Sequence, residues 1–421
     1  MEKLFINGSV PLKGEITVNG AKNSSLPILA CALLCEGTTC IHNCPELSDV
    51  DATVKILTHL GCRVSREGSD ITVCTDGCCR CDVPDSLMSE MRSSIVFLGA
   101  ILARCRSARL SFPGGCELGP RPIDLHLAAL RRLGAQIDET GGTLDCKCDR
   151  GLCGNTVTLS FPSVGATENT MIAAAAASGR TVIQNAAREP EICDLADFLN
   201  KAGAQIYGSG ESTIIIDGVP KLHGCEHTVI PDRIEAATFM AASAVTGGDL
   251  IIRDVVPRHL QPVIPVFEQA GCDIKCLQNI ITVKSPARLG PFKCIRTLPY
   301  PGFPTDAQAI VMAASTVAQG TSIFIENIFD SRYKHTHELR RMGAEIKTEG
   351  RMAVVQGVDH LTGTGVTATD LRGGAALVVA GLCAHGQTAI GGLNLLDRGY
   401  AHLARRLRGV GADIERRAPD A

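Results

Sequence analysis

The sequence contains no tryptophan, and only 4% of its 421 residues are aromatic. A core for a chain of this length must therefore consist of Ala, Val, Ile, Leu and Cys, which favours many small, closely packed elements. An excess of charge is also missing, because 41 basic and 44 acidic residues leave a net charge of −3. No basic field exists to recruit nucleic acid or an anionic membrane, so an anionic ligand requires a local concentration of positive charge.

Long apolar runs are missing as well. The run SSIVFLGAILA at 93–103 is shorter than the roughly 18 residues that cross a bilayer. The N-terminal sequence MEKLFINGSVPLKGE lacks the charged-then-apolar pattern of a secretory signal. We therefore expect a cytoplasmic protein that does not associate with membranes. In that compartment the 20 cysteines are expected to be mostly reduced thiols that pack as small apolar side chains.

A short signature recurs six times: an apolar helical stretch, then Gly, then Ala or Cys, then any residue, then Ile or Val. The six glycines are Gly61, Gly134, Gly203, Gly271, Gly343 and Gly411, at intervals of 73, 69, 68, 72 and 68 residues. Such even spacing indicates an internal repeat. Each glycine is expected to end a helix in the left-handed backbone region, and the alternating residues after it predict a strand.

The first half of each repeat also recurs, as an apolar helix that ends in a glycine-containing turn and is followed by a strand. Two examples are TENTMIAAAAASGRTVIQNA at 167–186 and DAQAIVMAASTVAQGTSIFIEN at 306–327. These helices are apolar on nearly every face, so we expect them to be buried. The predicted fold is α/β, with six βαβαββ-like repeats in two groups of three that meet near 215–230.

Polar residues stand where each inner helix is predicted to begin. They are Lys22-Asn23, Arg92, Thr167-Glu168, Asp232-Arg233, Thr305-Asp306, and Asp370 with Arg372. Arginines stand where five of the outer helices are predicted to begin: Arg121, Arg188, Arg258, Arg332 and Arg398. Helix N-termini favour anions, and guanidinium groups match phosphate and carboxylate oxygens, so the whole set predicts a site for a doubly anionic ligand. For any single residue the alternative is a helix cap or a surface charge.

Cys116 differs from the other cysteines, because it lies in the loop sequence FPGGCELGP (112–120) between glycines and close to Arg121. A loop thiol beside positive charges is a candidate acid, nucleophile or redox sensor. Two further groups stand in predicted hairpins: Cys74, Cys78, Cys79 and Cys81, and then Cys146, Cys148 and Cys153. Neither group has histidines at zinc-ligand spacing, so thiols packed within hairpins are favoured over a metal site.

Several long motifs carry a family resemblance. They include NGAKNSSLPILACALL, PGGCELGPRPIDLH, PYPGFPTDAQA, TDLRGGAALVVAGL and LDRGYAHLARRLRGVGA. In these motifs the chain resembles the UDP-N-acetylglucosamine 1-carboxyvinyltransferases of the EPSP synthase superfamily. The resemblance implies a two-domain inside-out α/β barrel with its active site between the domains. Repeats 1–3 would occupy 22–229, and repeats 4–6 would occupy 1–21 plus 230–421.

The resemblance also implies a reaction and its substrates. The enolpyruvyl group of phosphoenolpyruvate would pass to the 3′-hydroxyl of UDP-N-acetylglucosamine with release of phosphate, the first committed step of bacterial peptidoglycan synthesis. Cys116 would protonate the C3 methylene of phosphoenolpyruvate and would be the residue alkylated by fosfomycin, and Asp306 would be the base. Lys22, Arg121 and Arg398 would clamp phosphoenolpyruvate. The other implied substrate-site residues are Asn23, Arg92, Pro122, Ile123, Asp124, Leu125, Ser163, Val164, Gly165, Ile328, Arg332, Asp370 and Arg372. No metal or organic cofactor is implied.

Three alternatives remain on the sequence alone. A shikimate-pathway enolpyruvyl transferase would carry a Lys-Ser pair at the first inner helix and no loop cysteine, where this chain has Lys22-Asn23 and Cys116. An inactive repeat scaffold would be expected to lose the helix-opening charges, which are intact here. A thiol redox sensor would use Cys116 without needing it for turnover. The chain departs from some family members at Phe161, where they carry a basic residue and phenylalanine offers no cation to a diphosphate.

Overall fold

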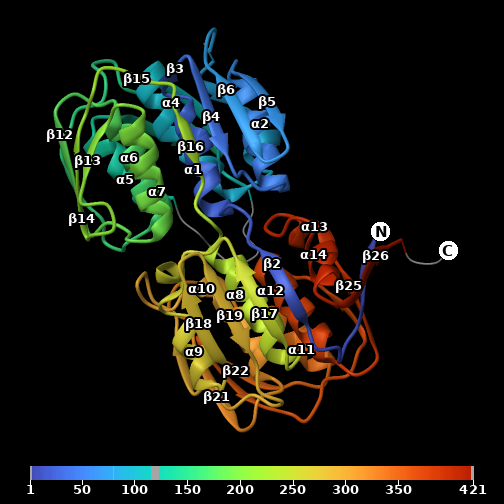
Figure 1. Ribbon diagram of the computed structural model, residues 1–421. Coiled ribbons are helices and arrows are strands. Elements are labelled where there is room, and N and C mark those ends of the chain that lie inside the picture. Colours follow the sequence, from blue (N-terminus) through green and yellow to red (C-terminus); the bar gives the residue numbers. More distant parts are fainter. Residues whose placement is uncertain (1, 79, 115–122, 419–421) are drawn as a thin grey trace. The chain divides into compact units, whose positions relative to one another are not determined.

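The computed structural model describes residues 2–78, 80–114 and 123–418, which divide into two compact units (Figure 1). The C-terminal unit contains residues 2–19 and 231–418, and the N-terminal unit contains residues 20–114 and 123–230. Each unit contains three of the six repeats. Within the described ranges, no helix combines the length and the apolar character needed to cross a membrane.

Each repeat of the N-terminal unit forms a four-stranded sheet in which one parallel pair is extended by an antiparallel hairpin. The strand orders are β16-β4-β6-β5, β7-β8-β10-β9 and β11-β12-β14-β13, and a further pair joins β15 to β3. The strands are β3 (Cys35–Glu36), β4 (Thr38–His42), β5 (Arg63–Glu67), β6 (Asp70–Cys74), β7 (Asp82–Val83), β8 (Ser107–Ser111), β9 (Gln136–Thr140), β10 (Thr143–Lys147), β11 (Thr156–Thr158), β12 (Arg180–Gln184), β13 (Gln205–Tyr207), β14 (Thr213–Asp217), β15 (Leu222–His223) and β16 (Glu226–Thr228).

The C-terminal unit contains three sheets with the same strand arrangement, in the orders β18-β19-β17-β2, β20-β21-β23-β22 and β24-β25-β1-β26. In the last sheet β1 and β26 take the place of the hairpin. Its strands are β1 (Lys3–Asn7), β2 (Lys13–Thr17), β17 (Asp249–Arg253), β18 (Asp273–Leu277), β19 (Ile280–Lys284), β20 (Cys294–Arg296), β21 (Thr321–Ile325), β22 (Glu345–Glu349), β23 (Met352–Gln356), β24 (Gly365–Thr367), β25 (Gln387–Gly391) and β26 (Asp413–Arg417). The sixfold recurrence of one sheet pattern confirms the internal repeat.

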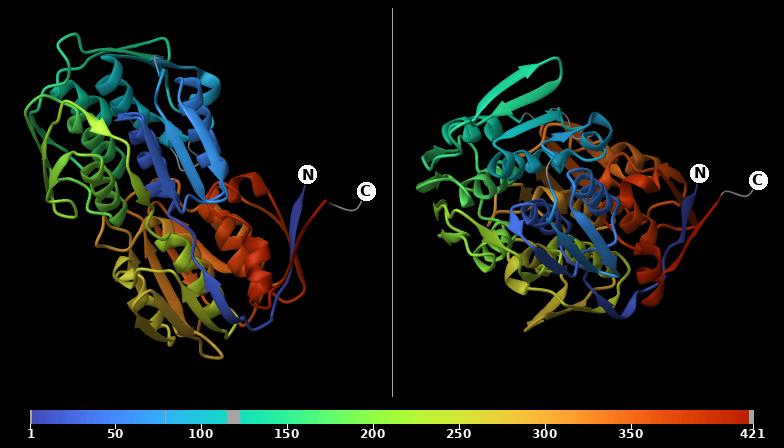
Figure 2. Two further views of the ribbon diagram at one scale, coloured as in Figure 1. Left: turned by 45° about the horizontal axis from the view of Figure 1, so that its top comes forward. Right: turned by 90° about the horizontal axis from the view of Figure 1, so that it is seen from above.

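Three strands complete sheets that belong to distant parts of the chain. Strand β1 pairs with both β25 and β26, so that Leu4 lies opposite Ile390. Strand β2 pairs in parallel with β17, and β16 pairs in parallel with β4. The beginning and the end of the chain consequently lie side by side in one sheet (Figure 2).

All six signature glycines adopt the left-handed conformation that was predicted for them. Their φ angles are 101° at Gly61, Gly134 and Gly203, 99° at Gly271 and Gly411, and 94° at Gly343. Each follows the C-terminal turn of an outer helix and precedes a strand. A residue with a Cβ is strained at these angles, which explains why the position is glycine in every repeat.

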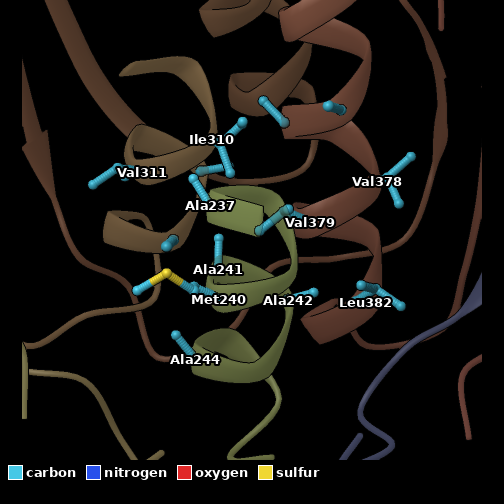
Figure 3. Packing of buried hydrophobic residues seen from close by; sticks show 14 of the residues in the cluster. Ala237, Met240, Ala241, Ala242, Ala244, Ile310, Val311, Val378, Val379 and Leu382 are labelled. Atoms are coloured by element: carbon cyan, nitrogen blue, oxygen red, sulfur yellow. The ribbon is translucent and has the colours of Figure 1, made fainter. Parts of the chain in front are cut away.

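The inner helices are buried, as their composition predicts. They are α1 (Lys22–Ala32), the 3-10 turn η1 (Arg92–Val96) continued by α4 (Phe97–Cys105), α6 (Val164–Ala175), α8 (Arg233–Val245), α10 (Thr305–Ser315) and α12 (Leu371–Cys383). Within each unit the three inner helices contact one another. In the C-terminal unit, Ala237 and Ala241 of α8 lie between the side chains of α10 and α12 (Figure 3). Small side chains let the helices approach closely, so the aromatic-poor composition is what a three-helix centre requires.

The outer helices pack against inner helices and against neighbouring strands. They are α2 (Ser48–His59), α5 (Asp124–Arg132), α7 (Pro190–Lys201), α9 (Ile264–Gln269), α11 (His335–Arg341) and α14 (Leu403–Gly409). Short helices α3 (Asp85–Met88) and α13 (Leu393–Leu396) and the 3-10 turn η2 (Pro257–Leu260) complete the described elements. The six α/β repeats in two units confirm the repeat organisation that the sequence predicts and the inside-out barrel that the family resemblance implies.

Gly357→Ala tests the close packing between the end of the β22–β23 hairpin and the turn that follows α10. A Cβ at Gly357 would lie 1.6 Å from the carbonyl oxygen of Ala318, whereas one at Gly365 would meet nothing within 4 Å. We expect Gly357→Ala to lower the free energy of unfolding by about 3 kcal/mol, since the obstacle is backbone, and Gly365→Ala to change it by less than about 0.5 kcal/mol. Urea denaturation followed by circular dichroism measures both. Equal stabilities for the two variants would contradict this account of the packing.

Candidate active site

A cluster of charged side chains in the C-terminal unit surrounds Asp306, in the first turn of α10. The Arg332 Nη2 atom lies 2.8 Å from Asp306 Oδ1, and the Arg372 Nη2 atom lies 3.0 Å from Asp306 Oδ2. Arg332 precedes α11, and Arg372 lies in the first turn of α12. One guanidinium group therefore holds each oxygen of the carboxylate.

Exposure distinguishes the three members of this cluster. The Asp306 side chain is 26% exposed, while the side chains of Arg332 and Arg372 are 2% and 4% exposed. The carboxylate thus reaches solvent, and the two cations lie beneath it. Paired cations favour the ionised carboxylate, which is the form that can accept a proton from a hydroxyl group.

The equivalent acids in the neighbouring repeats have a different task. Asp232 accepts hydrogen bonds from the backbone N–H groups of Ile234 and Glu235, and Asp370 accepts them from Arg372 and Gly373. Both are therefore N-caps, the alternative that the sequence left open. In α10 the N-cap residue is Pro304, which offers no side-chain cap. Asp306 lies two positions after Pro304, and its carboxylate accepts hydrogen bonds from Arg332 and Arg372.

Arg372 is held on its other side by Tyr400. The Tyr400 hydroxyl lies 3.3 Å from Arg372 Nη1 and 2.9 Å from Thr238 Oγ1 in α8. Since the Thr238 hydroxyl donates to the carbonyl of Ile234, it accepts from Tyr400, and Tyr400 in turn accepts from Arg372. Burial raises the pKa of Tyr400, which keeps its hydroxyl protonated as this chain of hydrogen bonds requires.

Arg332 is fixed by backbone contacts. Its Nε and Nη2 atoms donate to the carbonyl oxygen of Thr305, at 3.3 and 3.0 Å. Its own carbonyl oxygen lies 3.1 Å from His335 Nδ1, which must therefore carry a proton. Burial lowers the pKa of His335 to about 4, so the imidazole is neutral near pH 7 and adds no positive charge beside Arg332.

Two more residues that the family resemblance implies for the substrate site, Arg398 and Ile328, belong to the C-terminal unit. Arg398 is half-buried between α13 and Tyr400. The next residue, Gly399, packs so tightly that a Cβ there would lie 2.7 Å from Leu371 Cδ1 at the start of α12. The segment that carries Arg398 is therefore seated on the helix that carries Arg372. Ile328 is half-buried and follows β21.

In the N-terminal unit, Lys22 opens α1 and is paired with a carboxylate that the sequence did not single out. The Lys22 Nζ atom lies 2.8 Å from Asp49 Oδ2, in the first turn of α2. Asn23, the next residue, is half-buried. Arg92 opens η1, and its Nη1 atom donates to the carbonyl oxygen of Pro113 at 3.3 Å. Cys116, Arg121 and Pro122 lie outside the described residues.

The predicted residues at the starts of α5 and α6 lie close together. Ser163 caps α6, with its Oγ atom 3.3 Å from the backbone N of Ala166. A Cβ at Gly165 would lie 3.0 Å from the His126 ring in α5, so glycine permits this approach. Asp124 is exposed at the start of α5, and Ile123 is buried immediately before it. Leu125 and Val164 are half-buried in the first turns of α5 and α6.

Comparison with known proteins identifies the family. Residues 6–407 match the profile of EPSP synthase (3-phosphoshikimate 1-carboxyvinyltransferase). A relative from Caldanaerobacter subterraneus, named UDP-N-acetylglucosamine 1-carboxyvinyltransferase 2, is 52% identical over 416 residues and covers 99% of this chain and 100% of its own. A relative from Symbiobacterium thermophilum, named UDP-N-acetylglucosamine 1-carboxyvinyltransferase 1, is 50% identical over 420 residues, with coverage of 99% and 95%. The chain belongs to the EPSP synthase family.

Solved structures of the family have the same fold. The enolpyruvyl transferase NikO from Streptomyces tendae superposes with a TM-score of 0.90 at 26% identity, covering 99% of both chains. An EPSP synthase from Acinetobacter baumannii superposes with a TM-score of 0.77 at 21% identity, covering 99% of this chain and 100% of its own. The architecture of six repeats is thus common to family members with different sequences.

Sequence reasoning missed Glu326, which organises the segment that carries Ile328. Glu326 is 1% exposed. Its carboxylate accepts hydrogen bonds from Thr297 Oγ1 at 2.8 Å, Thr305 Oγ1 at 3.0 Å and the backbone N of Ile328 at 2.8 Å. The segment after β21 is consequently tied to the first residue of α10. A signal was present, since strand alternation places Ser322, Phe324 and Glu326 on the same, buried face.

Glu168 in α6 is a second buried acid, and the sequence had named it only as a helix-opening residue. Burial raises its pKa to about 8, with the charges of Glu191 and Glu189 adding to the effect. Near pH 7 this carboxyl group therefore holds a proton. Glu168 lies in the first half of α6, so this protonated carboxyl group is near the N-terminal end of an inner helix.

Tyr400→Phe tests whether the hydroxyl between Arg372 and Thr238 positions Asp306. Removing that oxygen leaves a buried charged donor without an acceptor, so we expect kcat to fall by about tenfold, or about 1.4 kcal/mol, while KM for each substrate stays nearly constant. Thr238→Val should give the same direction of change. The control is Tyr207→Phe, because Tyr207 is 56% exposed in the other unit. Steady-state kinetics that show no change of kcat in Tyr400→Phe would refute the positioning role.

Proposed function

We propose that the chain transfers the enolpyruvyl group of phosphoenolpyruvate to the 3′-hydroxyl of UDP-N-acetylglucosamine and releases phosphate. The observation that carries the proposal is the identity of 45–52% over nearly the whole chain with relatives named UDP-N-acetylglucosamine 1-carboxyvinyltransferase. The partly exposed Asp306 carboxylate, fixed by two buried cations, supplies the base that this reaction needs. In this proposal the enzyme works in the cytoplasm, at the first committed step of peptidoglycan synthesis.

The reaction is an addition followed by an elimination. The sugar 3′-oxygen adds to C2 of phosphoenolpyruvate as Asp306 takes the hydroxyl proton and an acid protonates C3. C2 then carries the sugar oxygen, the carboxylate and the phosphate. Loss of phosphate from C2 and of a proton from C3 restores the double bond and gives the enolpyruvyl ether. Cys116 is the proposed acid.

The proposed cation contacts neutralise the two anionic groups of phosphoenolpyruvate. Lys22, Arg121 and Arg398 hold the phosphate and the carboxylate in this proposal, since charge on these groups changes during addition and elimination. Arg332 and Arg372 act differently. Because their side chains are 2% and 4% exposed and donate to Asp306, we assign them to the orientation of the base.

The residues proposed to bind the sugar nucleotide lie mainly at the starts of α5 and α6. In this proposal Pro122, Ile123, Asp124 and Leu125 bind UDP-N-acetylglucosamine together with Ser163, Val164, Gly165 and Ile328. Asn23, Arg92 and Asp370 support the two substrate subsites. Phe161, two residues before the Ser163 cap, is 40% exposed. In this proposal it presents an aromatic ring to the sugar nucleotide at the position where some family members carry a basic residue.

An acceptor assay separates this function from 3-phosphoshikimate enolpyruvyl transfer, the activity after which the family profile is named. Purified enzyme should release phosphate from phosphoenolpyruvate with UDP-N-acetylglucosamine and not with shikimate 3-phosphate. Fosfomycin should block the release. Phosphate release with shikimate 3-phosphate alone would overturn the proposal, and no release with either acceptor would favour an inactive scaffold.

Cys116→Ala should abolish turnover or reduce it by at least about a hundredfold, because general acid catalysis contributes on that scale. Cys116→Asp should retain part of the activity, since a carboxylic acid still donates a proton, and it should resist fosfomycin. Phosphate release under saturating substrates measures both. Full activity in Cys116→Ala would exclude the acid role.

Asp306→Ala should stop product formation and leave binding of UDP-N-acetylglucosamine measurable by calorimetry. Because the alanine variant leaves two buried guanidinium groups without their acceptor, Asp306→Asn serves as the second variant: it retains an acceptor oxygen and removes the charge. Circular dichroism establishes that each variant is folded. Near-normal turnover in folded Asp306→Asn would show that Asp306 is not the base.

A further inference from the structure

Glu326 is a buried carboxylate that the proposed reaction does not use, and its two oxygens serve different segments of the C-terminal unit. The Oε1 atom accepts from Thr297 Oγ1 at 2.8 Å and from the backbone N atoms of Ile328 and Phe329 at 2.8 and 3.1 Å. The Oε2 atom accepts from Thr305 Oγ1 at 3.0 Å. Burial of a carboxylate is costly unless hydrogen-bond donors surround it, and these four donors meet that requirement.

On the Oε1 side, the carboxylate determines the course of the loop that follows β21. Thr297 Oγ1 donates to Glu326 and accepts from the backbone N of Asn327 at 2.9 Å, and the Asn327 side chain donates to the Thr297 carbonyl oxygen at 3.1 Å. Three successive backbone N–H groups, at 327–329, are therefore held by Glu326 and Thr297. Both of these side chains are buried, so the path of the loop is set by two fixed acceptors.

On the Oε2 side, the carboxylate holds the first residue of α10. Thr305 is fixed at two points, because its hydroxyl donates to Glu326 and its carbonyl oxygen accepts from Arg332 Nε at 3.3 Å and Nη2 at 3.0 Å. The helix has no side-chain N-cap, so its start is held from the side through Thr305. The next residue is Asp306, which accepts from the same arginine.

The strand end at Glu326 differs from the corresponding strand ends of four other repeats. The residues that directly follow β4, β12, β17 and β25 are Asn43, Asn185, Asp254 and Gly392, with φ angles of 60°, 57°, 53° and 73°. Glu326 directly follows β21 and does not adopt this left-handed conformation. The repeat that carries the proposed base therefore leaves its strand by a different path, which the buried carboxylate supports.

We propose that Glu326 is a positioning residue that keeps the acceptor-binding loop and the base in one alignment. The inference rests on the proposed function, in which Ile328 contacts UDP-N-acetylglucosamine and Asp306 takes the proton of its 3′-hydroxyl. Glu326 accepts from the backbone of Ile328 itself and from the residue before Asp306, so one side chain fixes both. Proton transfer requires the hydroxyl to lie within hydrogen-bond reach of the base, and small displacements of a reacting group are costly in rate.

Thr305→Val tests the base side of this arrangement. The substitution preserves the shape of the side chain and removes the hydroxyl that donates to Oε2, while the contacts at Oε1 remain. We expect kcat for phosphate release to fall by about tenfold, and the Kd of UDP-N-acetylglucosamine, measured by calorimetry, to change by less than about twofold. Thr316→Val is the matched control and should behave as the wild type, because the buried Thr316 hydroxyl lies at the other end of α10 and donates to Ala313 of the same helix.

Thr297→Val tests the loop side. It removes the donor to Oε1 and the acceptor of the Asn327 backbone N–H group, while Thr305 retains its contact with Oε2. We expect both the Kd and the KM of UDP-N-acetylglucosamine to rise by about tenfold, and the KM of phosphoenolpyruvate to stay within about twofold of its wild-type value.

Glu326→Gln and Glu326→Ala separate the shape of the side chain from its loss. Glutamine keeps one oxygen for the loop and presents an amide N–H group to Thr305, whose hydroxyl accepts as well as donates. Alanine removes both contacts. We expect Glu326→Gln to retain at least about ten times the kcat/KM of Glu326→Ala. Equal losses in the two variants would contradict the positioning role.

The pattern across the threonine variants distinguishes positioning from a purely structural role. Loss of folded protein alone would lower kcat in proportion to the active fraction and leave Kd and KM unchanged, and melting temperatures report that loss. An active wild-type enzyme in which Thr305→Val and Thr297→Val alter the same parameters to the same extent would overturn the inference. Absence of phosphate release by the wild-type enzyme is a different outcome, because it refutes the proposed function and the inference together.

Discussion

The C-terminal unit depends on one ionic arrangement: the Asp306 carboxylate accepts from Arg332 at one oxygen and from Arg372 at the other. Both guanidinium groups are buried, and a buried cation without its partner costs several kcal/mol. The structure therefore keeps the carboxylate in place, and the carboxylate keeps the cations compensated. Because the acid is 26% exposed and the two arginines are buried, this arrangement leaves a fixed carboxylate in contact with solvent.

The packing of the inner helices makes the arrangement possible. Small apolar side chains of α8, α10 and α12 pack against one another (Figure 3). This packing makes Asp306 and Arg372, which lie 66 positions apart at the starts of α10 and α12, neighbours. Repetition then gives the same position different tasks. Asp232 and Asp370 cap their helices, whereas the N-cap of α10 is Pro304, which provides no side-chain cap. Asp306 instead accepts hydrogen bonds from two arginines.

Several features of the fold could be read from the sequence because they depend on local patterns. Glycines with φ near 100° ended six outer helices as their spacing predicted, and apolar composition on every face identified the inner helices. The pairing of β1 with β25 and β26 has no local signal, and only the family resemblance implied that the first strand belongs with the last repeats. Glu326 could be predicted as buried from strand alternation, but it does not stand at a helix start, where the charged site residues were expected.

The side-chain partners within the candidate site were less accessible to sequence reasoning. The sequence named Asp306, Arg332 and Arg372, but their spacing contains nothing that pairs both arginines with one carboxylate. Lys22 and Asp49, or Tyr400 and Thr238, meet only after distant elements have packed. Their contacts follow from the tertiary structure of each unit and not from the periodicity of either segment.

A double-mutant cycle on Arg332→Lys and Arg372→Lys, measured as kcat/KM for phosphate release, tests most directly whether the two cations act through one carboxylate. Because both donate to Asp306, losing one changes the value of the other. We predict that the effects of the two substitutions differ from additivity by at least about 1 kcal/mol. Effects that add within about 0.3 kcal/mol would contradict the account, since they would mean that Arg332 and Arg372 act at independent places.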